Sequence, residues 1–160
     1  GKVAFYSGMY KVVENESQIA AVLGHEIGHV IARHGAERMA QQKLVQIGTL
    51  AAGVAISEMD RGKQGALMAA LGLGAQYGLL LPFSREHENE ADHIGLILAA
   101  RACFDPEEAP KLWDRMSRMH QGARPAEFMS THPADSTRIR NLTRLMPEAQ
   151  AEKAKYCGGR

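Results

Sequence analysis

The stretch Gly24-His25-Glu26-Ile27-Gly28-His29 decides how this sequence is interpreted, because it reads H-E-x-x-H inside a run that we expect to be helical. Histidines four residues apart leave the same face of a helix, about 6 Å apart along its axis. Two imidazoles placed in this way can bind one Zn²⁺, and the glutamate beside them can act as general base on a water at the metal. The pattern is short, so the rest of the chain must supply the remaining ligand.

The composition is that of an ordinary globular domain. The chain has 160 residues, of which 45% are hydrophobic and 23% charged, so we expect one domain, residues 1–160, with a core of its own. The formal net charge is +1, with no basic or acidic run, which excludes a nucleic-acid-binding surface. Nothing in the composition indicates an oligomeric state.

The N-terminal region predicts a strand followed by the H-E-x-x-H helix. Val3 to Tyr6 is β-branched and aromatic, which favours a short strand, and its abrupt start leads us to expect a chain truncated at the N-terminus. Asn15 and Gln18 have the spacing of a capping box at the start of the helix. We expect an apolar stripe to hold this helix in the core while the histidines face a cleft; the stripe consists of Ile19, Leu23, Ile27, Val30 and Ile31.

Residues 44–83 form an apolar segment that is interrupted by charges at residues 58–63. The part from Gly65 to Phe83 is long enough to cross a bilayer, but its glycines and late proline reduce its hydrophobicity. We therefore favour a helical hairpin packed on the H-E-x-x-H helix and touching a membrane surface over a transmembrane span.

The third zinc ligand is sought among acids and histidines in the second half of the chain, since a catalytic zinc has three protein ligands and one open position. The candidates are Glu86, His87, Glu88, Glu90, Asp92, His93 and His132. Ser84 is a suitable N-cap for a helix that extends to about Ala102. On it, Glu88 and Asp92 share one face, so Glu88 can bind zinc while Asp92 accepts the spare ring N–H of one histidine.

Two further helices are predicted towards the C-terminus. Asp105 and Pro106 precede a helix that directs Leu112, Trp113, Met116 and Met119 inwards. After a loop at residues 122–131, His132 and Pro133 open a last helix with a buried stripe of Ile139, Leu142 and Leu145, which Pro147 interrupts. By residue pattern alone, His132 is either a helix N-cap before the proline or a member of the site.

Residues 81–92, L-P-F-S-R-E-H-E-N-E-A-D, resemble the SR-x-x-E-x-x-A-D signature of gluzincin peptidases of the HtpX and BepA kind. More narrowly, the chain resembles the OMA-type membrane-linked quality-control proteases, which V-A-F-Y-S-G at residues 3–8, residues 20–29 and S-T-H-P at residues 130–133 also match. The resemblance covers essentially the whole chain. It implies a mainly α-helical, α+β zincin-like domain, with the H-E-x-x-H and E-x-x-x-D helices around a zinc cleft and a small β edge strand.

The resemblance also implies a role for each site residue. One Zn²⁺ per chain is expected on His25, His29 and Glu88, with Glu26 as base and acid and Asp92 holding a ligand histidine. His132 matches a cleft histidine that either stabilises the oxyanion or occupies the fourth zinc position in a closed resting form. Cys103 and Cys157 have no zinc-ribbon spacing, and two unrelated thiols are one interpretation. OMA-type proteins carry cysteines at these places, so the resemblance favours a disulfide.

These features predict a zinc-dependent metalloendopeptidase that cleaves misfolded or membrane-associated proteins, with unfolded chains adding to the edge strand at Val3 to Tyr6. The expected location is the cell envelope or periplasm, at a membrane, with the mitochondrial inner membrane as the alternative. A different function is a latent or chaperone-like protein-binding domain whose zinc site is closed by His132. Structural zinc sites have four protein ligands, so the number of ligands discriminates between the two functions.

Overall fold

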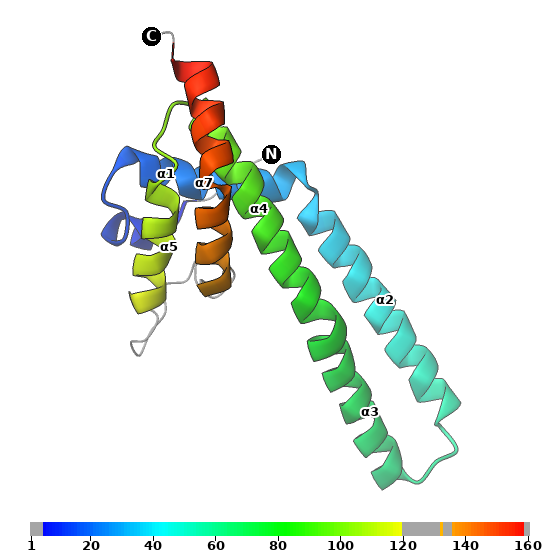
Figure 1. Ribbon diagram of the computed structural model, residues 1–160. Helices are drawn as coiled ribbons and strands as arrows, with labels where there is room; N and C mark the ends of the chain where they lie inside the picture. The colour runs from blue at the N-terminus through cyan, green and yellow to red at the C-terminus, as the bar shows by residue number, and fades with distance from the viewer. Residues whose placement is uncertain (1–4, 120–131, 133–135, 159–160) are drawn as a thin grey trace. The chain divides into compact units, whose positions relative to one another are not determined.

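The computed structural model describes residues 5–119, 132 and 136–158. The helices are η1 (Ser7–Lys11), α1 (Glu16–Ile31), α2 (His34–Ala55), α3 (Arg61–Ala75), η2 (Gln76–Leu80), α4 (Leu81–Arg101), α5 (Glu108–Met119) and α7 (Ser136–Cys157) (Figure 1). The mainly α class is therefore confirmed. The expected edge strand is not found in the described part of the chain, where Phe5 and Tyr6 lead directly into η1, while Val3 and Ala4 lie outside it. The chain divides into two compact units, residues 1–32 with 88–160 and residues 33–87.

The first unit has an apolar core in which α5 packs against α1 and α7. Figure 1 shows α5 and α7 side by side. Leu112, Trp113 and Met116 are buried as predicted, whereas Met119, at the end of α5, is 51% exposed. The core cluster consists of Met9, Val12, Ala21, Val22, Leu96, Ala100, Ala109, Leu112, Trp113, Met116, Leu142 and Ala149. Ile139 and Leu145 of the predicted stripe on α7 are partly buried against this cluster.

Helix α1 buries a different face from the one that its apolar stripe predicts. Ile27 is 40% exposed, and Val30 and Ile31 are both 57% exposed, so the expectation that this stripe holds the helix in the core is wrong. The buried residues of α1 are instead mostly small; they are Gln18, Ala21, Val22, Gly24, His25 and Gly28. Small residues allow the backbone of a neighbouring helix to approach closely, and this close packing outweighs the larger side chains on the other face.

The neighbouring helix is α4, and three glycines allow the contact. A Cβ atom on Gly24 would lie 2.6 Å from the carbonyl oxygen of Gly95, and one on Gly28 would lie 2.7 Å from that of Ala91. A Cβ atom on Gly95 would lie 2.5 Å from the backbone nitrogen of His25. These clashes are with backbone atoms, which cannot move aside as a flexible side chain can. The glycines within H-E-x-x-H and its flank are thus required for the approach of α1 to α4.

The start of α1 is fixed by a polar network that confirms Asn15 as the N-cap. The Asn15 side chain accepts a hydrogen bond from the Gln18 N–H at 3.0 Å. The reciprocal bond differs from a standard capping box, because the Gln18 side chain accepts from the Glu14 N–H at 2.9 Å. Asn15 and Gln18 also donate to Glu108 of α5 at 2.8 Å and 2.7 Å. The hydrogen bond from Lys111, together with these two, lowers the pKa of Glu108 to about 2.

Two predicted helix boundaries are wrong. Helix α4 begins at Leu81, so Ser84 lies inside it and is not its N-cap. Pro82 is the second residue of α4, directly after the π-helical turn η2, where irregular hydrogen bonding accommodates a residue without a backbone N–H. Pro147 does not interrupt the last helix, because α7 continues through it to Cys157. The buried Ala149 and the bond at Cys157 hold the part of α7 that follows the proline.

A disulfide joins Cys103, just after α4, to the last residue of α7. The S–S distance between Cys103 and Cys157 is 2.05 Å, and their Cα atoms are 5.7 Å apart. The two residues are 54 positions apart in sequence. Closing a loop of this length stabilises a fold by roughly 4 kcal/mol in the chain-entropy description. Cys103 has a φ of 72°, in the left-handed region, so the bond is made from the turn that ends α4.

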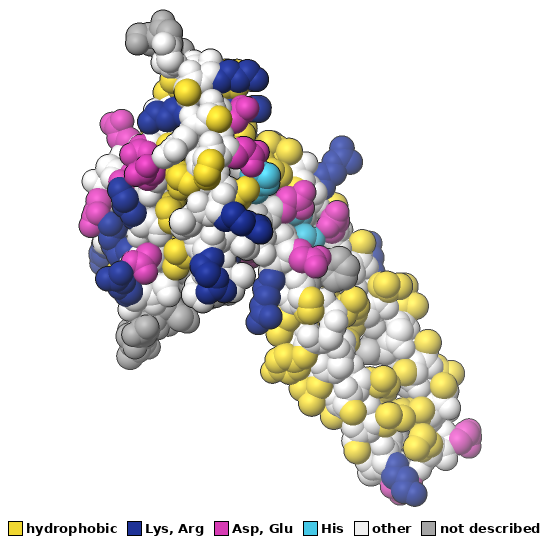
Figure 2. All heavy atoms as spheres, in the orientation of Figure 1, with side chains coloured by type: hydrophobic (Ala, Val, Ile, Leu, Met, Phe, Trp, Pro, Cys, Tyr) yellow, Lys and Arg dark blue, Asp and Glu magenta, His cyan; other side chains and the backbone are white. Residues whose placement is uncertain are grey.

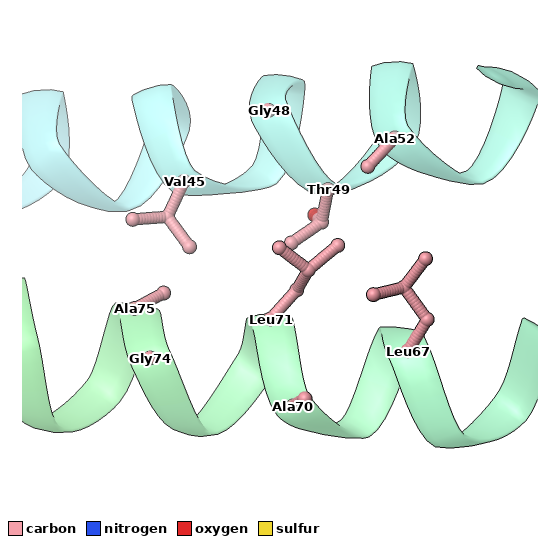
Figure 3. A pocket seen from close by; sticks show the side chains of 9 residues that line it. All are labelled: Val45, Gly48, Thr49, Ala52, Leu67, Ala70, Leu71, Gly74 and Ala75. Atoms are coloured by element: carbon pink, nitrogen blue, oxygen red, sulfur yellow. The ribbon is translucent and has the colours of Figure 1, made fainter. Parts of the chain in front are cut away.

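The second unit is an antiparallel helical hairpin, as predicted for residues 44–83, although its first helix already begins at His34. Helices α2 and α3 pack against each other, and Asp60 caps α3 by accepting from the N–H groups of Gly62 and Lys63. A groove of about 510 Å³ lies between the two helices (Figure 3). Its lining is apolar and rich in small residues: Val45, Gly48, Thr49, Ala52, Leu67, Ala70, Leu71, Gly74 and Ala75.

The hairpin exposes apolar side chains along its length. Figure 2 shows them over both of its helices, with charged side chains gathered at the tip. The strongly exposed ones include Leu44, Ile47, Leu50, Val54, Leu73 and Tyr77. The helical run Arg61–Arg101 contains an 18-residue window with a mean hydropathy of 1.5, none of it buried, and is long and apolar enough to cross a membrane by length and composition.

The glycine contact predicts a large difference between two otherwise identical substitutions. Gly95→Ala places a methyl group against the backbone of α1, so we expect the free energy of unfolding to fall by about 1–3 kcal/mol or more. Gly72→Ala in α3 meets open space and is expected to be neutral or to stabilise by up to about 1 kcal/mol. Urea unfolding of both variants beside the parent chain measures this. Equal stability of the two variants would contradict the tight packing of α1 on α4.

Candidate metal centre

Three segments of the first unit bring four metal-binding side chains together. Helix α1 supplies His25 and His29, α4 supplies Glu88, and His132 precedes α7. One ligand atom of each residue lies within 4.8 Å of those of the other three. The Nε2 atoms of His25 and His29 are 3.1 Å apart, and each is 3.3 Å from an oxygen of Glu88. The His132 Nδ1 atom is 3.2 Å from His25 Nε2 and 3.1 Å from Glu88 Oε1.

These distances fit a tetrahedral zinc ion. With Zn–N bonds of about 2.0–2.1 Å, the ligand atoms of a tetrahedron are about 3.3 Å apart. The five separations given above, 3.1–3.3 Å, come close to this value, with His25 and His29 measured to different oxygens of Glu88. Three imidazole nitrogens and a carboxylate oxygen are also donors that zinc accepts. The residues present therefore fit the metal that the H-E-x-x-H pattern predicts.

Asp92 determines the orientation of the His25 ring. Its Oδ1 atom lies 2.9 Å from His25 Nδ1, and both side chains are almost completely buried. A carboxylate in this position accepts the Nδ1–H bond, which leaves a lone pair on Nε2 directed at the other three ligand atoms. The pairing of an aspartate with a ligand histidine is the arrangement predicted for Asp92, and His25 is the histidine that it contacts.

The electrostatics of the cluster keep its acids ionised. Burial alone would raise the pKa of Glu88, but hydrogen bonds from His132, His25 and His29 hold it far below its usual range. For Asp92, burial is likewise outweighed by its bonds to Arg138 and His25, so its pKa is lowered.

The two histidines of α1 shift in opposite directions. Bonds to Asp92 and Glu88 overcome the effect of burial and raise the pKa of His25. Burial, together with the neighbouring His25, lowers the pKa of His29, which favours a neutral ring able to bind a metal.

Glu26 lies at the edge of the cluster. Its Oε1 atom is 3.4 Å from His132 Nε2. The same oxygen is buried and accepts no hydrogen bond from the described residues. A buried carboxylate oxygen without a donor is costly, and it is common where a substrate or a reacting group completes the site. This geometry is that required of a general base beside the metal position.

The other candidate ligands do not join the cluster. Glu86 and Glu90 are exposed on α4. His93 contacts Glu148 at 3.1 Å. His87 contacts Glu37 at 2.8 Å, within the hairpin unit.

Sequence reasoning missed Arg138, a buried residue of α7 that contacts Asp92 and Glu88. The signal was available, because Arg138 has the helical spacing of the buried Leu142 and Ala149 and is a charged residue in an apolar stripe. A charge at such a position is typical of a residue paired with buried acids.

Comparison with known proteins finds one family and several relatives. Residues 1–146 match the model of peptidase family M48. Mitochondrial metalloendopeptidase OMA1 of Schizosaccharomyces pombe is 41% identical over 154 residues, which are 96% of this chain and 43% of that protein. The protein of the same name from Saccharomyces cerevisiae is 35% identical over 160 residues, 93% of this chain and 42% of its own. The beta-barrel assembly-enhancing protease of Escherichia coli is 32% identical over 144 residues, 87% and 29% respectively. No solved structure matches the chain significantly.

A helical domain in which an H-E-x-x-H helix and an E-x-x-x-D helix converge on one donor set belongs to the gluzincin class of metallopeptidases, as the sequence predicts. Within that class, the chain belongs to peptidase family M48. It spans less than half the length of these relatives.

Proposed function

We propose that this chain is the catalytic domain of a zinc-dependent metalloendopeptidase that hydrolyses peptide bonds in misfolded or membrane-associated proteins. The observation that carries the proposal is the convergence of His25, His29, Glu88 and His132 on one point, with the Glu26 carboxylate beside it. Membership of peptidase family M48 supports the same activity. The chain's relatives act in mitochondria or on β-barrel assembly by name, which supports a membrane-associated location, in a cell envelope or periplasm or alternatively in mitochondria.

His25, His29 and Glu88 would hold one Zn²⁺, with Asp92 fixing the His25 ring. When bound, zinc polarises the scissile carbonyl and makes the attacking water more acidic. Glu26 would take the proton from that water as its oxygen attacks the carbonyl carbon. The same carboxyl group would then give the proton to the leaving amine as the C–N bond breaks. The lowered pKa values of His29 and Glu88 favour a neutral ring and an ionised carboxylate, whereas His25, whose pKa is raised by Asp92 and Glu88, would release a proton on binding zinc.

His132 would keep this enzyme in a closed resting form. Its Nδ1 atom lies 3.1 Å from Glu88, where a fourth ligand belongs, and its Nε2 atom faces Glu26. A catalytic zinc needs an open position for water, so the ring must move before a substrate can react. The same contact supports the second candidate function, a latent or chaperone-like protein-binding domain with a closed four-ligand site.

Residues 44–83 would contact a membrane. Their exposed apolar side chains lie along both helices, and the charged residues of the hairpin gather at its tip (Figure 2). An apolar surface of this extent on a helical hairpin is stabilised by an apolar surrounding, which a bilayer supplies.

The membrane proposal predicts flotation with vesicles. We expect the chain to float with vesicles of phosphatidylethanolamine and phosphatidylglycerol, and the double substitution Leu50→Glu and Val54→Glu to abolish flotation, because it places two charges in the apolar surface. Val30→Glu, at a similarly exposed apolar position of α1, is the matched control and should still float. A parent chain that stays at the bottom of the gradient would contradict the proposal.

The catalytic proposal predicts that Glu26→Gln separates zinc binding from cleavage. The variant should retain one zinc per chain, while cleavage of unfolded casein falls about 10²–10⁴-fold, because the amide cannot accept the proton. Zinc content by mass spectrometry and casein cleavage, with and without vesicles, measure both.

Two companion variants test the ligand set. Glu88→Gln should lose zinc and activity together, and Glu90→Gln, at an exposed position two residues on, should keep both. Wild-type rates in Glu26→Gln would exclude Glu26 as the base, and loss of zinc in Glu90→Gln alone would exclude Glu88 as a ligand.

The resting-form proposal predicts that His132→Ala increases casein cleavage several-fold with zinc retained, because the fourth position becomes free for water. The two candidate functions differ here, since a purely protein-binding domain gains no cleavage. A fall in rate of about 10²–10³-fold would instead assign His132 to oxyanion stabilisation.

A further inference from the structure

We propose that Arg138 is a positioning residue that fixes the zinc ligand Glu88 and the histidine-orienting Asp92 in one arrangement before any metal binds. This inference rests on the zinc site proposed above and assigns to α7 a part in the metal centre. Arg138 lies outside both sequence motifs that define the site, and it is only 3% exposed.

The guanidinium group of Arg138 bridges the two carboxylates. Its Nε and Nη2 atoms donate to the two oxygens of Asp92 at 2.8 Å and 2.7 Å, which is a bidentate pair. Its Nη1 atom lies 2.9 Å from Glu88 Oε2. The Oδ1 atom of Asp92 that accepts from Arg138 is the same atom that lies 2.9 Å from His25 Nδ1. Arg138 is therefore connected to two of the proposed ligands.

The plane of the guanidinium group is itself fixed. Its Cζ atom lies 3.9 Å from the ring centroid of Trp113, a buried residue of α5. The Trp113 ring also contacts His25, at a centroid distance of 5.4 Å. Stacking on the tryptophan removes rotational freedom from Arg138, so its donors point at fixed positions. The two carboxylates that accept from these donors are thereby held in place as well.

Charge gives Arg138 a second reason to be buried here. Glu88 and Asp92 lie four residues apart on one face of α4, and both carboxyl groups are buried. Like charges at this spacing repel each other, and burial makes the repulsion stronger. One guanidinium group between them offsets the repulsion, so the ligand set can assemble without the metal.

Arg138 affects zinc affinity in two opposite ways, through its placement of the two acids and through its positive charge. The two effects can therefore be measured separately. A cation near the site repels Zn²⁺, whereas correct placement of Glu88 and Asp92 favours binding. Arg138→Lys keeps the charge but replaces the planar fork with three donors on one nitrogen, which cannot reproduce the bidentate contact with Asp92 together with the contact to Glu88. The effect of this variant therefore reports the geometry alone.

The test compares zinc binding by the full chain and by Arg138→Lys in competition with a chromophoric chelator. We expect binding about 10- to 100-fold weaker in the variant, the range found when groups that support metal ligands are lost. The absorption bands of the Co²⁺-loaded chain should also change, since they report ligand geometry. Arg140→Lys is the matched control, on the same helix but exposed and bonded to Ser136 and Thr137, and should match the parent chain.

The possible outcomes test the positioning role of Arg138 and the proposed zinc site separately. A zinc affinity within about twofold of the parent, with an unchanged Co²⁺ spectrum, would overturn the proposal, even if the thermal midpoint falls, because Arg138 would then only stabilise α7. A parent chain that binds no zinc would overturn the proposed function instead.

A measurement on the unsubstituted, metal-free chain keeps the proposal testable if Arg138→Lys does not fold. Nitrogen-15 NMR should show a proton on His25 Nδ1 that exchanges slowly with water, whether or not Nε2 is also protonated, because Asp92 is held in place to accept it. A rapidly exchanging mixture of tautomers would show that the site is not arranged in advance, and would overturn the proposal.

Discussion

The proposed metal centre depends on the contact between the backbones of α1 and α4 at Gly24, Gly28 and Gly95. One helix carries the two histidines and the other carries Glu88 with Asp92, so their ligands meet only if the helix axes come very close. Glycine costs about 1 kcal/mol of helix stability at each such position relative to alanine. That cost is offset by the close packing of the two helices and by the polar contacts that the approach makes possible, such as the one between His25 and Asp92.

The charged side chains around the site are buried, which would be strongly unfavourable for any one of them without its partners. Glu88, Asp92 and Arg138 are each less than a tenth exposed, and each has its partner within hydrogen-bonding distance. The acids are on α4, the arginine is on α7 and the tryptophan beneath it is on α5. Three helices thus meet at one polar cluster, which joins the apolar core to the metal position. Removing one member would leave another buried charge uncompensated.

The hairpin unit, residues 33–87, differs from the first unit in exposing most of its apolar side chains. It has no buried residue on α3, and its apolar side chains are exposed along both helices. In water such a surface is unfavourable, which is the basis of the membrane contact proposed for this unit. Its glycines and alanines leave a groove between the two helices, which the side chains in Figure 3 line. The same chain therefore contains one unit with a core of its own and one unit whose apolar surface faces outwards.

The sequence by itself determined what depends on local spacing. It predicted the H-E-x-x-H helix with its Asn15 cap, the pairing of Glu88 with Asp92 on one helix face, and the helical hairpin, because each follows from the 3.6-residue period of a helix. Only the tertiary structure decided which face of α1 is buried, that His132 lies among the ligand atoms and that Arg138 holds the acids. The tertiary structure also showed that α4 begins before Ser84 and that α7 continues through Pro147. These outcomes depend on which distant segments pack together. The local pattern can mark a residue such as Arg138 as buried, but it does not identify the residues that it contacts.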